Sequence, residues 1–284
     1  MAKIILSAFA DEYNRDIDVQ LSALNELGIG YIEPRFVGDK NVSELTDEEA
    51  YELKEKLDKA GIKVYSVGSP LGKVNLADDF DAHLALSERV FRTAKILGAK
   101  CIRVFSFYLR EGDKRDEKVL AEVCERLTKM IDLADKYGVT LCHENEAGIY
   151  GEGDTDCRAL LDAMGGRLKC VFDMGNFVLG GYTPYPTGYE LLKDYIEYFH
   201  IKDAIGRNAI VPPGCGDATI SEVLAAYLKD FDKDVVATLE PHLETFSGLN
   251  KLTDVTFDNP YKFESPEAAF IEAANRIKEI VSKI

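Results

Sequence analysis

The chain alternates short runs of apolar and β-branched residues with longer amphipathic stretches, and this alternation constrains the fold more than any other feature. In four places a glycine ends a helical stretch directly before a strand-like run, at Gly28, Gly61, Gly98 and Gly138. Strands that are separated by helices run parallel and are joined by right-handed crossovers. The pattern therefore predicts an α/β protein with a parallel sheet.

The alternation yields eight predicted strands, which is the number in a (β/α)₈ TIM barrel. The predicted strands are Ile4–Phe9, Tyr31–Glu33, Lys63–Val67, Cys101–Phe105, Val139–Glu144, Lys169–Phe172, Tyr198–Ile201 and Val235–Leu239. The clearest predicted helices are Asp47–Ala60, His83–Leu97, Glu117–Tyr137, Ser221–Lys229 and Glu267–Lys283. A TIM barrel needs about 250 residues, so we expect one domain over residues 1–284. An open doubly wound sheet is the alternative fold, although no GxGxxG motif follows the first strand.

The charge balance limits the classes of partner. The chain has 34 Lys and Arg against 50 Asp and Glu, a formal net charge of −16, which opposes binding to nucleic acid and to anionic membranes. No apolar run approaches the ~20 residues of a membrane helix, and the first residues lack a signal-peptide pattern. Six scattered cysteines without a CxxC motif suit reduced thiols. We expect a cytoplasmic protein that acts on a small molecule.

Four consecutive predicted strands, the fifth to the eighth, finish in side chains that can bind a metal ion. These side chains are Glu144, Asp173, His200 and Glu240. Each alone has an ordinary explanation, as a solvated strand end, a turn residue or a hydrogen-bonded histidine. In a TIM barrel, however, the carboxyl ends of the strands meet at one rim, where such groups repel one another unless a cation or protons neutralise them. Three carboxylates and one imidazole favour a single Mn²⁺ or Mg²⁺ ion, with Co²⁺ or Zn²⁺ as alternatives.

The segment His143–Glu146, with sequence HENE, contains two of the acidic candidates. Side chains alternate along a strand, so Glu144 and Glu146 share one face while His143 and Asn145 share the other. If the glutamates face the barrel axis, Glu144 lies at the rim and Glu146 one layer above it. His143 then faces the helices in a structural role, and HENE does not match the HExxH motif of zinc proteases.

Five short motifs occur in a fixed order along the second half of the chain. They are EN at 144–145, DxGN at 173–176, HxKD at 200–203, PGxG at 213–216 and LE at 239–240. This order resembles the xylose isomerase-like TIM barrel superfamily, and the resemblance covers essentially the whole chain, including GIGYIEP at Gly28–Pro34. The superfamily contains sugar and sugar-phosphate isomerases, ketose 3-epimerases, inosose dehydratases and DNA-repair enzymes of the endonuclease IV type.

The resemblance implies roles for individual residues. It implies that Glu144, Asp173, His200 and Glu240 bind one divalent metal, and that Lys202, Asp203 and Arg207 contact substrate oxygens. The chain departs from the endonuclease branch, because Asn176 stands where that branch has a histidine and the whole chain has only four histidines. A histidine-rich three-metal cluster cannot be assembled from them, which leaves DNA repair a minor alternative.

The isomerase and epimerase branches abstract a proton next to a carbonyl and form an enediolate that a metal stabilises. Glu144 and Glu240 are then the catalytic carboxylates: two acting on opposite faces of a sugar give epimerisation, and one acting alone gives aldose–ketose isomerisation. Further contacts to a carbohydrate substrate are expected from Glu146, Asn176, Lys73 and Arg103. A metal-dependent dehydratase of an inosose or keto acid and a non-catalytic sugar-binding barrel remain alternatives. Phosphorylation of the sugar and assembly into a homo-oligomer are left open.

Overall fold

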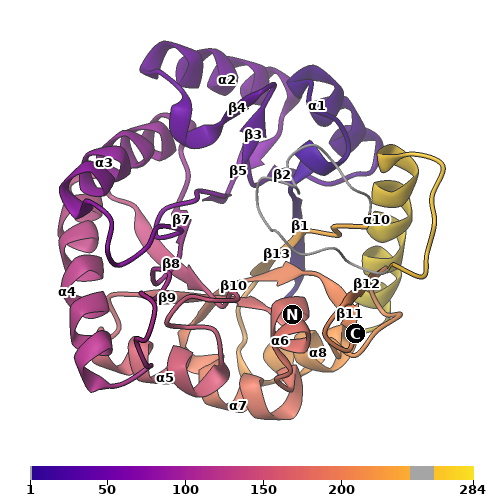
Figure 1. The fold of residues 1–284 in the computed structure, drawn as a ribbon. Coiled ribbons are helices and arrows are strands. Elements are labelled where there is room, and N and C mark those ends of the chain that lie inside the picture. The colour runs from indigo at the N-terminus through magenta and orange to yellow at the C-terminus, as the bar shows by residue number, and fades with distance from the viewer. Residues whose placement is uncertain (1, 244–258) are drawn as a thin grey trace.

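The computed structural model of the chain describes residues 2–243 and 259–284, which form a ring of helices around a cylinder of parallel strands (Figure 1). Seven strands form one curled parallel sheet in the order β1-β13-β10-β9-β8-β7-β6, and β2 pairs in parallel with β5. The predicted (β/α)₈ TIM barrel is therefore confirmed.

The barrel strands are β1 (Ile4–Ala8), β2 (Tyr31–Ile32), β5 (Lys63–Val64), β6 (Ser66–Val67), β7 (Cys101–Val104), β8 (Thr140–Glu144), β9 (Lys169–Asp173), β10 (Ile196–Ile201) and β13 (Val235–Leu239). The helices are α1 (Ile17–Glu26), α2 (Asp47–Ala60), α3 (Phe80–Leu97), α4 (Glu117–Ala134), α5 (Asp154–Ala163), α6 (Met174–Gly180), α7 (Tyr189–Leu192), α8 (Ile220–Asp230) and α10 (Pro266–Lys283). Two antiparallel hairpins leave the barrel, β3 (Phe36–Val37) with β4 (Lys40–Asn41) and β11 (Asp203–Ile205) with β12 (Ala209–Val211). Short 3₁₀ and π turns cover Ala10–Glu12, Val42–Glu44, Asp135–Tyr137, Pro184–Gly188 and Lys193–Tyr195.

Backbone hydrogen bonds close the barrel where the strands are shortest. The amide of Glu33, just after β2, donates to the carbonyl of Ala8 on β1 at 3.0 Å. The amide of Gly68, just after β6, donates to the carbonyl of Pro34 at 3.0 Å. The first bond links β1 to the end of β2, and the second links the end of β2 to the end of β6, so the barrel wall continues past the seven-stranded sheet. They also fix the backbone on both sides of Glu33.

The predicted third strand, Lys63–Val67, is split into β5 and β6 at Tyr65. The split arises because the two halves have different partners: β5 pairs with β2, whereas β6 pairs with β7. Tyr65 lies between the two strands, and its hydroxyl donates a hydrogen bond to Glu197 at 2.6 Å. The other strand and helix predictions match the structure to within a few residues at each end.

Local signals place the helix ends as predicted. Thr46 and Glu49 form a capping box at the start of α2, since each side chain accepts a hydrogen bond from the other residue's backbone amide. Gly61 and Gly98 adopt the left-handed conformation at the ends of α2 and α3. Among the described residues, no helix is long and apolar enough to cross a membrane. All six cysteines are free thiols.

His83 on α3 supplies a prediction about stability and pH. Its buried Nε2 accepts a hydrogen bond from the Gly72 amide at 3.0 Å, which requires a neutral ring, and burial lowers the pKa of His83 to about 4. In the unfolded chain the same imidazole binds a proton near pH ~6.5. The contribution of His83 is therefore complete above pH ~6.5 and is lost as the pH falls toward 4, with a total loss of up to about 3 kcal/mol.

This pH dependence is measured by urea unfolding of the wild type and of His83→Gln at several pH values between ~4 and ~7. We expect the free energy of unfolding to fall more steeply with decreasing pH in the wild type than in His83→Gln, because the other three histidines are common to both proteins. Equal slopes in the two proteins would contradict the neutral, hydrogen-bonded state of His83.

Candidate metal centre

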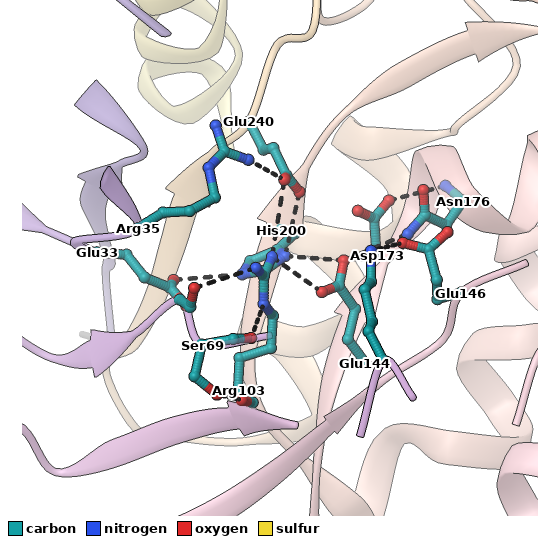
Figure 2. A network of polar contacts seen from close by, with 12 residues as sticks. Glu33, Arg35, Ser69, Arg103, Glu144, Glu146, Asp173, Asn176, His200 and Glu240 are labelled. Carbon is teal, nitrogen blue, oxygen red and sulfur yellow. Dashed lines mark hydrogen bonds and ion pairs between the residues drawn. The ribbon is translucent and has the colours of Figure 1, made fainter. Parts of the chain in front are cut away.

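The four predicted ligands come together at the carboxyl end of the barrel. Glu144 ends β8, Asp173 ends β9, His200 lies near the end of β10, and Glu240 follows β13. One ligand atom from each lies within 4.8 Å of those of the other three, and all four residues are buried (Figure 2). They meet because the sheet register sets His200 beside Asp173 on one neighbouring strand and beside Thr238 on the other.

The contacts within this cluster fit a divalent cation. His200 Nδ1 lies 3.1 Å from Glu144 Oε1 and 3.4 Å from Glu240 Oε2. Glu144 Oε2 is buried and accepts no hydrogen bond from the described residues. Three carboxylates, one of them with this buried oxygen, and one imidazole form a donor set typical of Mn²⁺, Mg²⁺ or Zn²⁺. The residues present therefore fit a single divalent metal ion.

The ionisation of the cluster favours cation binding. Burial opposes ionisation of Glu144, but His200 and Arg103 lower its pKa to about 2. Burial also opposes ionisation of Glu240, but Lys202 and His242 hold its pKa well below the usual range. For Asp173, burial is the largest influence and raises the pKa to about 6, although Lys202 opposes the shift. All three carboxylates are therefore ionised at neutral pH.

Lys202 lies inside the cluster, next to the ligand carboxylates. Its Nζ donates to Asp173 Oδ2 at 3.0 Å and approaches Glu240 Oε2 at 3.2 Å. Asn176 links it to Glu144, because Asn176 Oδ1 accepts from Lys202 Nζ at 3.1 Å and Asn176 Nδ2 donates to Glu144 Oε1 at 3.2 Å. A Cβ atom on Gly175 would lie 2.6 Å from Lys202 Cγ, which explains the glycine of the DxGN motif.

Arg103 on β7 contacts two of the clustered carboxylates. Its Nη1 lies 3.2 Å from Glu144 Oε2 and 3.7 Å from Glu240 Oε1. Its Nε and Nη2 donate to the carbonyls of Ser69 and Gly68, which fix the guanidinium in the loop after β6. Arg103, predicted as a substrate contact, thus lies against the cluster with its charge directed at both catalytic candidates.

The structure adds a second buried arginine that the sequence analysis missed. Arg35 donates from Nε to Asp11 at 2.9 Å, from Nη2 to Glu12 at 3.1 Å and from Nη1 to Glu240 Oε1 at 2.9 Å. Its side chain is only 1% exposed. This bond holds Oε1 of Glu240 and leaves Oε2 to face His200 and Lys202. Glu12, Glu240 and His242 also have ligand atoms within 4.8 Å of one another, and the guanidinium of Arg35 bonds to both of these glutamates.

Glu33 is the second residue that the sequence analysis missed. It follows β2 in the GIGYIEP segment and is fully buried beside His200. The rule that polar side chains after barrel strands face the active site could have identified both Glu33 and Arg35. The second strand was predicted to end at Glu33, but Glu33 is not among the predicted site residues.

Two predicted substrate residues lie at the outer rim as a pair. Lys73 Nζ donates to Glu146 Oε2 at 2.7 Å, and the ammonium lies 4.5 Å from the centre of the Phe105 ring. Their side chains are 14% and 19% exposed, so both remain accessible to a small molecule at the mouth. Glu146 lies further out than Glu144, as the alternation along the strand predicted.

Asp203 and Arg207 are not brought into the cluster. The buried carboxylate of Asp203 accepts hydrogen bonds from the backbone amides of Ala204, Gly214, Gly216 and Ala218, and so organises the segment that contains the PGxG motif. Arg207 is exposed at the tip of the β11–β12 hairpin, next to Gly181. The carboxylate of Asp203 has its oxygens occupied by the backbone, and Arg207 lies outside the buried site.

The remaining residues of the HENE segment stabilise the rim. His143 faces away from the ligands, and its Nε2 lies 2.9 Å from Ser106 Oγ. Burial lowers the pKa of His143 to about 4, so the ring is neutral. Asn145 joins β8 to β9 by two bonds with the backbone of Asp173, accepting from its amide at 3.0 Å and donating to its carbonyl at 2.9 Å.

Comparisons with known proteins identify the family of this chain. No curated protein matches the chain. Solved structures with the same fold include the IOLI protein with a bound zinc atom, with a TM-score of 0.77 and 20% identity over 99% of this chain and 98% of that one. D-psicose 3-epimerase with D-tagatose from Clostridium cellulolyticum H10 has a TM-score of 0.69 and 15% identity over 97% of each chain. The probable 3-DHS dehydratase AsbF from Bacillus anthracis has a TM-score of 0.68 and 17% identity over 84% of this chain and 92% of that one.

At these identities the solved structures establish the fold alone, and their ligands differ among themselves. The family model described as xylose isomerase-like TIM barrel matches residues 21–280, which include β2 to β13 and the four clustered residues. The chain therefore belongs to the xylose isomerase-like TIM barrel family.

Proposed function

We propose that the protein is a divalent-metal-dependent sugar isomerase or epimerase that abstracts a proton next to a carbonyl group. One observation carries the proposal: two glutamates from separate strands, Glu144 and Glu240, converge with Asp173 and His200 in a buried cluster of ligand atoms within 4.8 Å of one another. The similarity in fold to a solved ketose 3-epimerase supports the same class of reaction.

Glu144, Asp173, His200 and Glu240 would hold the metal, which we propose to be Mn²⁺ or Mg²⁺. When bound, the cation stabilises the negative charge that develops on the substrate oxygens during proton abstraction. Lys202, Asn176 and Arg103 would bind hydroxyl or carbonyl oxygens near the reacting carbons, since each already donates to a carboxylate of the cluster. The Lys73–Glu146 pair would contact the outer part of the sugar.

The chain's own carboxylates would transfer the proton. Glu144 and Glu240 come from β8 and from the end of β13, which are separated by β9 and β10 in the sheet. One carboxylate would remove the proton from the carbon and the other would return a proton to the opposite face, giving epimerisation. If a single carboxylate performs both transfers on one face, the reaction becomes aldose–ketose isomerisation.

A dehydratase acting on an inosose or keto acid is the second candidate, and Lys202 is the observation that favours it. The ammonium group lies 3.0 Å from Asp173 and 3.2 Å from Glu240, within the cluster. After a carboxylate has taken the proton from carbon, Lys202 could donate a proton to the departing hydroxyl, so that the C–O bond breaks and water is released. The similarity in fold to a probable dehydratase agrees with this alternative.

The two candidates are separated by ¹H and ¹³C NMR of reactions in D₂O. The purified protein, loaded in turn with Mg²⁺, Mn²⁺, Co²⁺ or Zn²⁺, is incubated with ketoses, inososes and their phosphates. An isomerase or epimerase gives a product of the same formula with deuterium at the reacting carbon, whereas a dehydratase gives a product that has lost water. Binding of a sugar without turnover under every metal would contradict both enzymatic proposals.

A further inference from the structure

We infer that Glu33 is a positioning residue that fixes the tautomer and orientation of His200, so that Nδ1 presents its lone pair to the metal ion. The inference rests on the proposed metal site. It assigns a role to a residue outside the set of four ligands, just after β2 at a different part of the barrel wall.

The geometry around His200 separates its two ring nitrogens. Nδ1 faces the ligand carboxylates, at 3.1 Å from Glu144 and 3.4 Å from Glu240. Nε2 faces the other way and lies 3.2 Å from Glu33 Oε2. Figure 2 shows Glu33 and Glu144 on opposite sides of the imidazole ring. In the neutral ring, a proton on Nε2 that is donated to Glu33 leaves Nδ1 with a lone pair, which can bind a cation.

Glu33 is held in turn by a chain of buried hydroxyl groups. The Tyr198 hydroxyl lies 2.8 Å from Glu33 Oε1 and 2.8 Å from Ser66 Oγ. The Tyr198 hydroxyl is the donor in its hydrogen bond to Glu33. The backbone amide of Glu33 is bonded to Ala8 on β1. Both the side chain and the backbone of Glu33 are therefore fixed before any ligand binds.

A carboxylate suits this position better than an amide. Glu33 accepts from two donors with separate oxygens, one from Tyr198 and one from His200. Glutamine could accept from only one of them with its oxygen and would present an NH₂ donor to the other. The imidazole is further confined by edge-on contacts with Phe9 and Tyr198, at centroid distances of 5.1 and 5.4 Å. Packing therefore fixes the plane of the His200 ring, and Glu33 fixes which ring nitrogen carries the proton.

The test measures metal affinity without any substrate. Isothermal titration of the metal-free protein with Mn²⁺ is carried out for the wild type, Glu33→Ala, Glu33→Gln and the control Ser106→Ala. Loss of a carboxylate behind a metal-binding histidine typically weakens affinity about 10- to 100-fold, so we expect this loss in Glu33→Ala and a smaller loss in Glu33→Gln. Ser106→Ala removes the buried partner of His143, which is not a ligand, and should leave Mn²⁺ affinity within about twofold of the wild type.

A second measurement follows the tautomer directly. The chain has four histidines, so ¹⁵N-histidine NMR of the Zn²⁺-loaded wild type should resolve His200 as a ring with Nδ1 on the metal and a proton on Nε2. In Glu33→Gln, which keeps the side-chain volume, the Nε2–H resonance of His200 should shift and broaden. Circular dichroism confirms that each variant is folded.

The outcomes distinguish this inference from the proposed function. A wild type that binds no divalent metal overturns both. Metal binding by the wild type with an equal affinity in Glu33→Ala, or an equal loss in Glu33→Ala and Ser106→Ala, overturns only the role of Glu33. If Glu33→Ala does not fold, Glu33→Gln decides. Wild-type Mn²⁺ affinity and an unchanged His200 spectrum in Glu33→Gln would overturn the role of Glu33.

Discussion

Replacing Glu144 or Glu240 by glutamine is expected to lower turnover by about 10²- to 10⁴-fold while the barrel still folds. Glutamine keeps the volume of the side chain but cannot accept a proton from carbon at neutral pH and binds a divalent cation poorly. Losses of similar size are expected in the two variants, because each glutamate has one oxygen paired with a buried arginine, Glu144 Oε2 with Arg103 at 3.2 Å and Glu240 Oε1 with Arg35 at 2.9 Å.

The control for this prediction is Glu197→Gln. Glu197 is also a glutamate on a barrel strand, but it lies on β10 three residues before His200 and pairs with Lys100 and Tyr65 away from the cluster. Initial rates are measured for all three variants with the substrate identified by NMR, together with metal content by atomic emission. Wild-type rates in metal-loaded Glu144→Gln or Glu240→Gln would refute the proton-transfer roles. A loss of the same size in Glu197→Gln would show that the effect is not specific to the site.

The cluster of Glu144, Asp173, His200 and Glu240 was predictable because each residue lies at or just after the carboxyl end of a strand that the alternation predicted. In a parallel barrel such residues meet at one rim whatever their distance along the chain, so Asp173 and Glu240 could be paired without a structure. The same topology explains why the side-chain alternation correctly separated Glu144 from His143. These are consequences of strand direction and side-chain period, which sequence patterns record.

The positions of Glu33 and Arg35 after a predicted strand could have been read from the sequence, but the partners of these residues depend on tertiary contacts that the pattern does not record. Arg35 lies two residues beyond the predicted end of the second strand, and its role arises from the adjacent Asp11 and Glu12 together with Glu240, which is 205 residues away. For Asp203, the HxKD motif predicted a substrate contact. In the structure the chain folds back, and backbone amides of the following residues surround the Asp203 carboxylate. Which partner a buried charge finds is decided by packing, so a charged residue near the rim does not by itself indicate a role in binding.

Replacing Arg35 by methionine is expected to lower the free energy of unfolding by about 3–5 kcal/mol, which is a large share of the ~5–15 kcal/mol that stabilises a typical protein. The guanidinium is the shared partner of Asp11, Glu12 and Glu240, and methionine leaves these buried carboxylates without it. The free energy of unfolding of Arg35→Lys should lie between those of the wild type and Arg35→Met, because one ammonium group keeps the charge but cannot bond to three carboxylates with the same geometry.

Arg92 on α3 is the matched control for Arg35. It is also an arginine paired with a carboxylate, at 3.2 Å from Asp47, but both side chains are more than 40% exposed. Water screens such a pair, so Arg92→Met should cost less than about 1 kcal/mol. Urea unfolding at neutral and at mildly acidic pH provides the measurement. The deficit of Arg35→Met should shrink at the lower pH, because protonation of Asp11, whose pKa burial already raises, removes part of the uncompensated charge. Equal losses in Arg35→Met and Arg92→Met would mean that the buried carboxylates do not depend on Arg35 for their neutralisation.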